Sequence, residues 1–320
     1  MQFLIRPPEL EVSPENPFEH DALKRKALEP IMSEFITQTA GPFVLALDSP
    51  WGTGKTTFIR MWKEELRKKG YTTLYFNAWE TDFVDDPLVA LIGELAEAIE
   101  ELSSASEKES KLQKAFNKTR AIAGSILKRS VPTAVRMATY GLVDLDSQSE
   151  RELANLVGQL VEERIQSYEA SKSEIKDFKQ SLKNIVEEIS KVDEGKLPIV
   201  FFVDELDRCR PSYAVELLER VKHLFEVEGI VFILGIDRQQ LSHSVRAIYG
   251  SQFNAEGYLR RFIDIDYQLP EPESGSYCDS LFSTLGINDL LQKRTTRDRK
   301  GELYRLSDTL STLFEVSRLG

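Results

Sequence analysis

Residues 49–56, with the sequence SPWGTGKT, are the stretch whose residue types and spacing point most directly to chemistry. Its glycines let the backbone curl so that several N–H groups face one anion, and the start of a helix adds partial positive charge there. Lys55 would reach the β- and γ-phosphates of a nucleotide, and the Thr56 hydroxyl would bind Mg²⁺. The stretch therefore predicts a phosphate-binding P-loop. The residues expected to bind the nucleotide are Trp51, Gly52, Thr53, Gly54, Lys55, Thr56 and Thr57.

The residues on either side of this stretch support the prediction. An apolar run at 43–47 precedes it, and a helical pattern begins at Thr57. The alternative is a glycine-rich turn that carries a lysine by chance, and the flanking strand and helix count against it. The general pattern has glycine at position 49, where this chain has Ser49 followed by Pro50. We expect phosphate binding to survive, with Ser49 affecting the geometry at the entry of the loop.

A second set of candidate functional residues lies downstream, where an apolar run at 197–203 ends in Asp204 and Glu205. Acidic residues often end strands at a protein surface, so this pattern alone is a weak signal. Combined with the P-loop, it predicts a Walker B element, in which Asp204 holds the shell of the Mg²⁺ ion. The Glu205 carboxylate would orient or deprotonate the attacking water. The expected metal ligands are therefore Thr56 and Asp204, and Glu205 and Lys55 are expected to be catalytic.

Polar residues at the ends of two later segments give further candidates. The apolar run at 230–236 ends at Asp237, which either senses the γ-phosphate or caps the next helix, and the two roles are compatible. Arg260 and Arg261 come just before a strand pattern at 263–269. Either arginine could be a finger that reaches a phosphate on a neighbouring subunit, a role that contributes about 10³–10⁵ in rate. The alternative is an ordinary surface arginine.

The composition narrows the class of protein. A chain of 320 residues holds one large domain or two smaller ones, and its net charge of −11 counts against nucleic-acid binding by the whole surface. Cys209 and Cys278 form neither a disulfide framework nor a metal-ligand spacing, which favours a reducing, cytoplasmic setting. The first residues lack a signal-peptide core, and no apolar run reaches the ~18 residues of a membrane span.

The hydrophobic pattern places helices and strands around these groups. Residues 1–20 are expected to form an extended segment that leads into the core. Residues 274–320 are expected to form a small helical region. Strands are expected at 43–47, 71–76, 197–203, 230–236 and 263–269, and helices at 21–39, 57–69, 87–102, 212–225 and 255–262. The final residues, 314–320, stop in the middle of a pattern, which suggests the front part of a longer protein.

Residues 103–195 have the character of a helical insertion. A helical stripe of apolar residues runs from Ile175 to Ile189, and we expect a hairpin of two helices with a break near 171–173. The segment 111–145 mixes apolar residues with lysines and arginines. It is either a basic amphipathic face for a membrane surface or nucleic acid, or a helix docked on the protein with its charges in solvent, which we favour.

Taken together, these motifs resemble the KAP family of P-loop NTPases over roughly residues 15–270. The combination is specific, whereas any one motif alone is not. One departure is the pair Arg260 and Arg261, where the family more often has an acidic residue beside a basic one. The matching stretches are PWGTGKTTF at 50–58, YFNAWE at 75–80, VDELDRC at 203–209, GIDR at 235–238 and YLRRFI at 258–263.

The resemblance implies an α/β fold: a three-layer α/β/α P-loop NTPase whose parallel sheet has extra strands between the Walker A and Walker B strands. The expected divisions are 1–102 and 196–270 for the two halves of the core, 103–195 for the insertion and 271–320 for the helical region. Many members carry transmembrane helices between the Walker motifs, but the insertion of this chain is charged, so we do not expect it to span a membrane. Ser317 and Arg318 resemble the start of a helix whose arginine contacts nucleotide.

The leading hypothesis is a Mg²⁺-dependent ATP hydrolase that acts as a nucleotide-driven switch or assembly module. The family includes bacterial phage-exclusion proteins, so antiphage defence is the expected setting, in the cytoplasm or peripheral to a membrane. One alternative is an ATP-gated scaffold with slow hydrolysis, whose partner is another protein or a second copy. A nucleic-acid-stimulated motor is the other alternative, and only the basic part of the insertion supports it.

Overall fold

A parallel sheet forms the centre of the protein. The computed structural model describes residues 11–39, 41–103, 109–129, 150–191 and 196–272, together with 275, 279 and 282. Within these residues, five strands lie in the order β2-β3-β4-β1-β5 and all pairs are parallel. They are β1 (Phe43–Asp48), β2 (Tyr71–Asn77), β3 (Lys196–Asp204), β4 (Ile230–Ile236) and β5 (Ile265–Gln268). Because β4 separates β1 from β3, the additional-strand arrangement is confirmed.

Apolar side chains cover both faces of this sheet, as a parallel sheet requires. Alternate residues of β1 belong to different hydrophobic clusters: Val44 and Ala46 lie in one, and Leu45 and Leu47 in the other. The same alternation runs through β3 and β4. This two-sided burial explains why their sequences are almost continuous apolar runs, and it fixes which end of each strand meets the loops.

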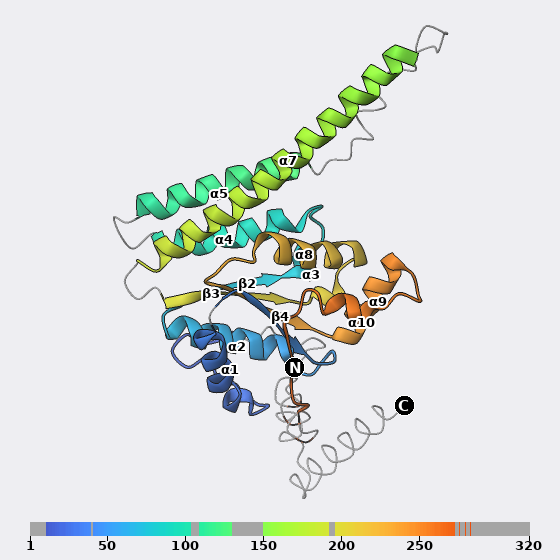
Figure 1. The fold of residues 1–320 in the computed structure, drawn as a ribbon. Coiled ribbons are helices and arrows are strands. Elements are labelled where there is room, and N and C mark those ends of the chain that lie inside the picture. Colours follow the sequence, from blue (N-terminus) through green and yellow to red (C-terminus); the bar gives the residue numbers. More distant parts are fainter. Residues whose placement is uncertain are drawn as a thin grey trace, which may run out of the picture.

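Helices form a layer on each face, giving the expected three layers (Figure 1). On one face pack α1 (Glu29–Gln38) and α2 (Lys55–Lys68). The other face is covered by α4 (Pro87–Ser103), α8 (Pro211–Leu224), α9 (Arg238–Tyr249) and α10 (Ala255–Leu259). Short helices η1 (Arg25–Ala27), α3 (Ala78–Thr81) and η2 (Leu206–Arg208) lie in the connections.

Within its described residues, the insertion contains α5 (Glu109–Arg129) and α7 (Glu150–Ile189), which lie side by side above α4 (Figure 1). The expected break near 171–173 is wrong, because α7 is continuous there. Serine and lysine keep their backbone N–H groups and cost little in a helix, so they interrupt none of its hydrogen bonds. Among the described helices, none has the length and apolar character needed to cross a bilayer.

The α5 helix shows which side chains of the basic segment at 111–145 are buried and which are exposed, within the described residues. Leu112 and Phe116 are buried in the same cluster that covers the sheet, whereas Lys114 and Lys118 are exposed. This is the docked helix with its charges in solvent that we favoured. Residues 130–149, including Arg136, lie outside the described part of the chain.

The lead-in before β1 differs from the expected helix at 21–39. Lys24 adopts a left-handed conformation with φ 55°, and α1 begins only at Glu29. The Asp21 carboxylate accepts hydrogen bonds from the backbone N–H groups of Arg25 and Lys26 at 2.9 and 2.6 Å. These contacts replace the first helical turns with a compact loop and η1, so the sequence-based boundary was wrong.

Two later elements are shorter than expected. The α10 helix ends at Leu259, which leaves Arg260 and Arg261 in the turn that follows it, and β5 covers only Ile265–Gln268. The helical region expected at 274–320, with Cys278 and Arg318, lies outside the described residues apart from 275, 279 and 282. The division into domains stays a prediction.

Glu94, on α4, allows a pH test of the packing of this helix. Burial raises the pKa of Glu94 from 4.5 to about 7, with a smaller contribution from the charge of Glu97. The folded protein therefore holds this proton more tightly than the unfolded chain. Its contribution to stability is fully present below the unfolded pKa of 4.5 and is lost as the pH rises to about 7.

We expect Glu94→Gln, which mimics the protonated side chain, to raise the midpoint of thermal unfolding above that of the wild type at pH 8. At pH 4 the two midpoints should coincide. Thermal melts at both pH values measure the difference, with Glu34→Gln on the exposed side of α1 as the control. A gain of the same size at both pH values would contradict the assignment to Glu94.

Candidate nucleotide-binding site

The P-loop connects β1 to α2 and depends on glycine at two positions. Gly52 and Gly54 have φ angles of +77° and +81°, which side-chain-bearing residues rarely adopt. Gly54 is the residue before α2, and no side chain caps the first amides of that helix. Thr56 and Thr57 lie in its first turn and are partly buried. The open helix end is therefore a place where backbone N–H groups can bind an anion.

Ser49 fits the loop without the glycine of the general pattern. Its backbone is not left-handed, and its buried hydroxyl lies 2.5 Å from that of Thr53. The Thr53 hydroxyl donates to the Pro50 carbonyl at 2.9 Å. The Lys55 ammonium donates to the Ser49 carbonyl at 2.7 Å. Ser49 thus holds the entry of the loop through its hydroxyl and orients the lysine through its carbonyl.

Lys55 is buried in an acidic environment. Burial lowers the pKa of this lysine, and four carboxylates oppose that effect. They are Asp207, Asp204, Asp237 and Asp48. These acids stand at the carboxyl ends of β1, β3 and β4 or just beyond them, so one edge of the sheet gathers the predicted lysine and its counter-charges.

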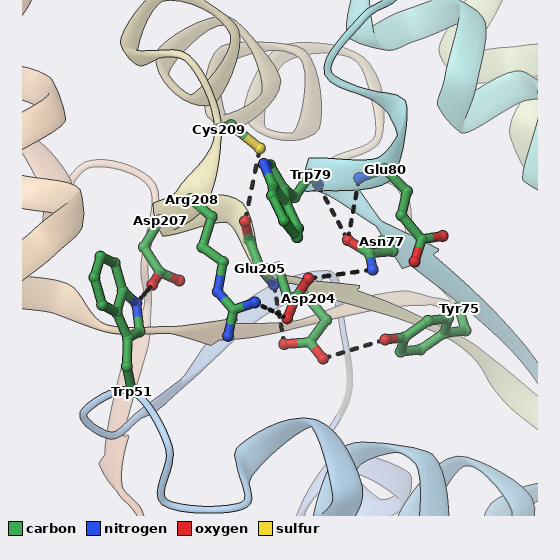
Figure 2. Close-up of polar contacts among 10 residues, drawn as sticks. All are labelled: Trp51, Tyr75, Asn77, Trp79, Glu80, Asp204, Glu205, Asp207, Arg208 and Cys209. Carbon is green, nitrogen blue, oxygen red and sulfur yellow. Dashed lines mark hydrogen bonds and ion pairs between the residues drawn. The ribbon is translucent and has the colours of Figure 1, made fainter. Parts of the chain in front are cut away.

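The expected metal ligands Thr56 and Asp204 lie near enough to each other for the Thr56 hydroxyl to act on the pKa of the Asp204 carboxyl. Burial raises the pKa of the Asp204 carboxyl, whereas hydrogen bonds from the Thr56 hydroxyl and the Glu205 amide lower it. The Glu205 amide donates to Oδ1 of Asp204 at 2.9 Å, and the Tyr75 hydroxyl donates to Oδ2 at 3.2 Å (Figure 2). Although the carboxylate is fully buried, each oxygen has a donor.

Glu205 is held on two sides. Its backbone is left-handed, with φ 59°, and its carboxylate oxygens have different partners. Oε1 forms an ion pair with Nη1 of Arg208 at 2.6 Å, and Oε2 accepts from the Asn77 side-chain amide at 3.3 Å (Figure 2). The Arg208 guanidinium also lies over the ring of Trp79, 5.7 Å from its centroid. The expected catalytic carboxylate is thus tethered through Arg208 and Asn77.

Asn77 connects Glu205 to α3. Its side-chain oxygen accepts from the backbone N–H groups of Trp79 and Glu80, at 3.1 and 3.3 Å, and so caps that short helix. This fixes the amide with its NH₂ group toward Glu205. Sequence reasoning noted the motifs around Asn77 and Arg208 but assigned these two residues no role. Their spacing alone did not indicate which side chains face Glu205.

Trp51, at the tip of the P-loop, makes a contact that the sequence did not predict. Its indole N–H donates to Oδ2 of Asp207, while the ring is about half exposed (Figure 2). The second oxygen of Asp207 is buried and has no hydrogen-bond partner. Trp51 therefore ties the loop to η2, and Asp207 keeps an unused acceptor close to Lys55.

The remaining candidates take different places. Asp237 caps α9 by accepting from the Gln240 amide at 3.1 Å, and its charge also acts on Lys55. Arg260 lines an open hollow of about 470 Å³ beside Asp48, and Arg261 is exposed. A finger role for either arginine stays a prediction. The other residues lining the hollow are Arg238, Glu256, Asp266 and Gln268.

A family model for the KAP family P-loop domain matches residues 29–319. The chain belongs to the KAP family of P-loop NTPases. Its relatives include the phage T7 exclusion protein of Escherichia coli (strain K12), which is 30% identical over 78 residues. That stretch is 24% of this chain and 10% of the relative. The ORC2 protein of Aeropyrum pernix, solved in ADPNP-ADP complexes, aligns over 88% of this chain and 54% of its own, with 16% identity and a TM-score of 0.35.

The donor set of this KAP domain fits the predicted Mg²⁺ ion. A hydroxyl and a carboxylate are hard oxygen ligands of the kind this ion prefers, and it takes its other ligands from water and phosphate. Space for the Asp204 carboxylate comes from Gly235, which faces it on β4. A Cβ atom on Gly235 would lie 2.7 Å from Oδ1 of Asp204 and would also overlap Ile59.

Gly235→Ala tests this arrangement. We expect it to displace the Asp204 carboxylate and to weaken nucleotide binding in the presence of Mg²⁺ by about tenfold or more, equivalent to ~1.4 kcal/mol. Binding in EDTA should change less, because Asp204 acts through the metal. Titration of a fluorescent nucleotide with and without Mg²⁺ measures both. Gly93→Ala is the matched control, since a Cβ there meets nothing within 4 Å. Equal losses in the two conditions would contradict the metal role.

Proposed function

We propose that this KAP domain binds ATP with Mg²⁺ and hydrolyses the bond between the β- and γ-phosphates, acting as a nucleotide-driven switch. The observation that carries the proposal is the position of the buried Asp204 carboxylate, which lies with Ile59 of α2 around Gly235, on the side of the sheet where α2 begins without a side-chain cap. A helix end that can bind an anion, the Thr56 hydroxyl in its first turn and the Asp204 carboxylate are then gathered at one edge of the sheet. That pairing suits a metal-bound polyphosphate.

The P-loop would bind the phosphates in this mechanism. The loop amides and the first turn of α2 would donate to phosphoryl oxygens, and the Lys55 ammonium would offset the charge that develops on them. Thr56 and Asp204 would hold Mg²⁺, which when bound neutralises charge on the β- and γ-phosphates. The acidic groups around Lys55 oppose the lowering of its pKa by burial and so favour the charged ammonium.

Glu205 would accept a proton from the attacking water. The water oxygen forms a bond to the γ-phosphorus, the bond to the bridging oxygen breaks, and that oxygen leaves with ADP. In the structure both Glu205 oxygens are engaged, by Arg208 and Asn77. Each oxygen can still accept a hydrogen bond from the water, but the two contacts fix the orientation of the carboxylate and limit its movement toward that water. This restraint favours slow basal turnover, as expected of a switch or of an ATP-gated scaffold.

Antiphage defence is the biological setting that we propose. Its support is the similarity to the phage T7 exclusion protein, which covers 24% of this chain. In such a setting the nucleotide state would control assembly with another protein or with a second copy of the chain. The slow turnover inferred from the Glu205 contacts would let the ATP-bound state persist long enough to act.

Glu205→Gln tests the hydrolytic role. We expect the variant to bind ATP as tightly as the wild type and to hydrolyse it about 10²–10⁴-fold more slowly, because the amide cannot take the proton. Binding is measured by nucleotide titration and turnover by phosphate release under single-turnover conditions. Glu80→Gln, which removes an exposed carboxylate from the neighbouring α3, should leave both values unchanged. Wild-type turnover in Glu205→Gln would remove this residue from catalysis.

Arg208→Gln tests the restraint on Glu205. Loss of the ion pair should raise basal turnover about twofold to fivefold with little change in KM, because a partly exposed pair is worth up to ~1 kcal/mol. Steady-state phosphate release over a range of ATP concentrations separates kcat from KM. The control is Arg210→Gln, which removes the same charge from a residue paired with Asp82 instead. A fall in turnover would show that Arg208 assists Glu205 rather than restraining it.

A further inference from the structure

Arg25, in the segment before β1, is a buried cation with an unused donor. The residue is 5% exposed. Its Nη2 atom donates to the Pro270 carbonyl at 3.1 Å, whereas Nη1 is buried and has no hydrogen-bond partner. Nearly all buried polar groups in native proteins are paired, so an orphan donor of this kind points to a missing acceptor.

The guanidinium of Arg25 stands against the P-loop. A Cβ atom on Gly54 would lie 3.6 Å from Nη1 of Arg25 and 2.7 Å from a methyl group of Leu23. Gly54 immediately precedes α2, so the orphan donor lies beside the helix end that carries the uncapped amides. The lead-in segment therefore contributes a charged side chain to the surroundings of the predicted phosphate site.

The positive charge of Arg25 at the start of α2 is only partly offset by a neighbouring acid. Asp21, the acid whose charge acts on Arg25, accepts hydrogen bonds with both carboxylate oxygens from the backbone N–H groups of Arg25 and Lys26. Burial lowers the pKa of Arg25 to about 10, and the charge of Asp21 only partly opposes this. A cation near a helix N-terminus is repelled by the helix dipole, and a buried charge without a partner destabilises the fold. An anion bound at the start of α2 would relieve both effects.

We propose that Arg25 is a phosphate-binding residue of the nucleotide site, whose Nη1 donates to a phosphoryl oxygen of the ligand held at the start of α2. This inference rests on the proposed function and extends it, because it makes the lead-in segment part of the site. The ligand class is a polyphosphate, and Arg25 supplies a second cation on the side of the loop opposite the acids around Lys55.

The test compares Arg25→Gln with Lys26→Gln. Both variants remove one positive charge from the same segment, but Lys26 is exposed. Binding of ATP and of inorganic tripolyphosphate is measured by calorimetric titration at fixed salt. Arg25→Gln should bind both ligands about 10–100-fold more weakly, as expected for loss of a hydrogen bond between charged groups. Lys26→Gln should stay within about twofold, as for a screened surface charge.

A second readout separates ligand binding from a structural role. Without ligand, Arg25→Gln should melt at the wild-type temperature or above it, because it removes an uncompensated buried charge. The rise in melting temperature on adding tripolyphosphate should be smaller than in the wild type. A lower melting temperature without ligand, together with wild-type affinity for tripolyphosphate, would show that Arg25 is only structural and would overturn the proposal.

Arg25→Lys covers the case in which Arg25→Gln does not fold, since it keeps the charge while losing the forked donor. It should bind tripolyphosphate several-fold more weakly than the wild type, and wild-type affinity would overturn the proposal. A loss of affinity for ATP alone would place Arg25 on the nucleoside and would also overturn it. If the wild-type protein binds neither ligand, the proposed function itself fails, an outcome distinct from unchanged affinity in the Arg25 variants.

Discussion

The structure depends on a buried carboxylate that reaches a helix end two strands away. The P-loop leaves β1 and Asp204 ends β3, with β4 between them, so the two are separated by about 10 Å of sheet. Asp204 pairs in register with Gly235 of β4, and the missing side chain there lets its carboxylate approach α2. The Glu205 amide and the Tyr75 hydroxyl donate to this carboxylate and offset part of the cost of burying its charge. Strand order and one glycine thus create the pocket together.

Local patterns of apolar residues in the sequence predict much of this framework. Continuous apolar runs at 43–47, 197–203 and 230–236 predicted the buried strands, because a sheet covered on both faces needs such runs. The strand order came from the resemblance to the family. The lead-in was wrong for a different reason: Lys24 is left-handed because the Asp21 carboxylate binds backbone amides, and composition gives no sign of that choice.

In the candidate site, too, some residues could be predicted from the sequence and others could not. Thr56 and Asp204 could be paired from sequence, since each follows a recognisable strand and both belong at the same sheet edge. The partners of Glu205 could not, because Asn77 lies 128 positions away and its role depends on the orientation of one amide. The proximity of Arg25 to Gly54 is similar: it follows from how the segment before β1 folds back on the loop, which no local motif encodes.

The P-loop has carboxylates around Lys55 and the guanidinium of Arg25 near Gly54, and one ligand that carries both signs of charge would suit both. The carboxylates that surround Lys55 form an acidic side at the ends of β1, β3 and β4, where a divalent cation would be attracted. On the lead-in side stands the buried guanidinium of Arg25, whose Nη1 lacks an acceptor. A free phosphate would pair with the Arg25 guanidinium but be repelled by the carboxylates around Lys55. A free cation would be attracted by those carboxylates but repelled by Arg25. A polyphosphate carrying its metal would complement both, so the asymmetry of charge around the loop would suit Mg²⁺-ATP.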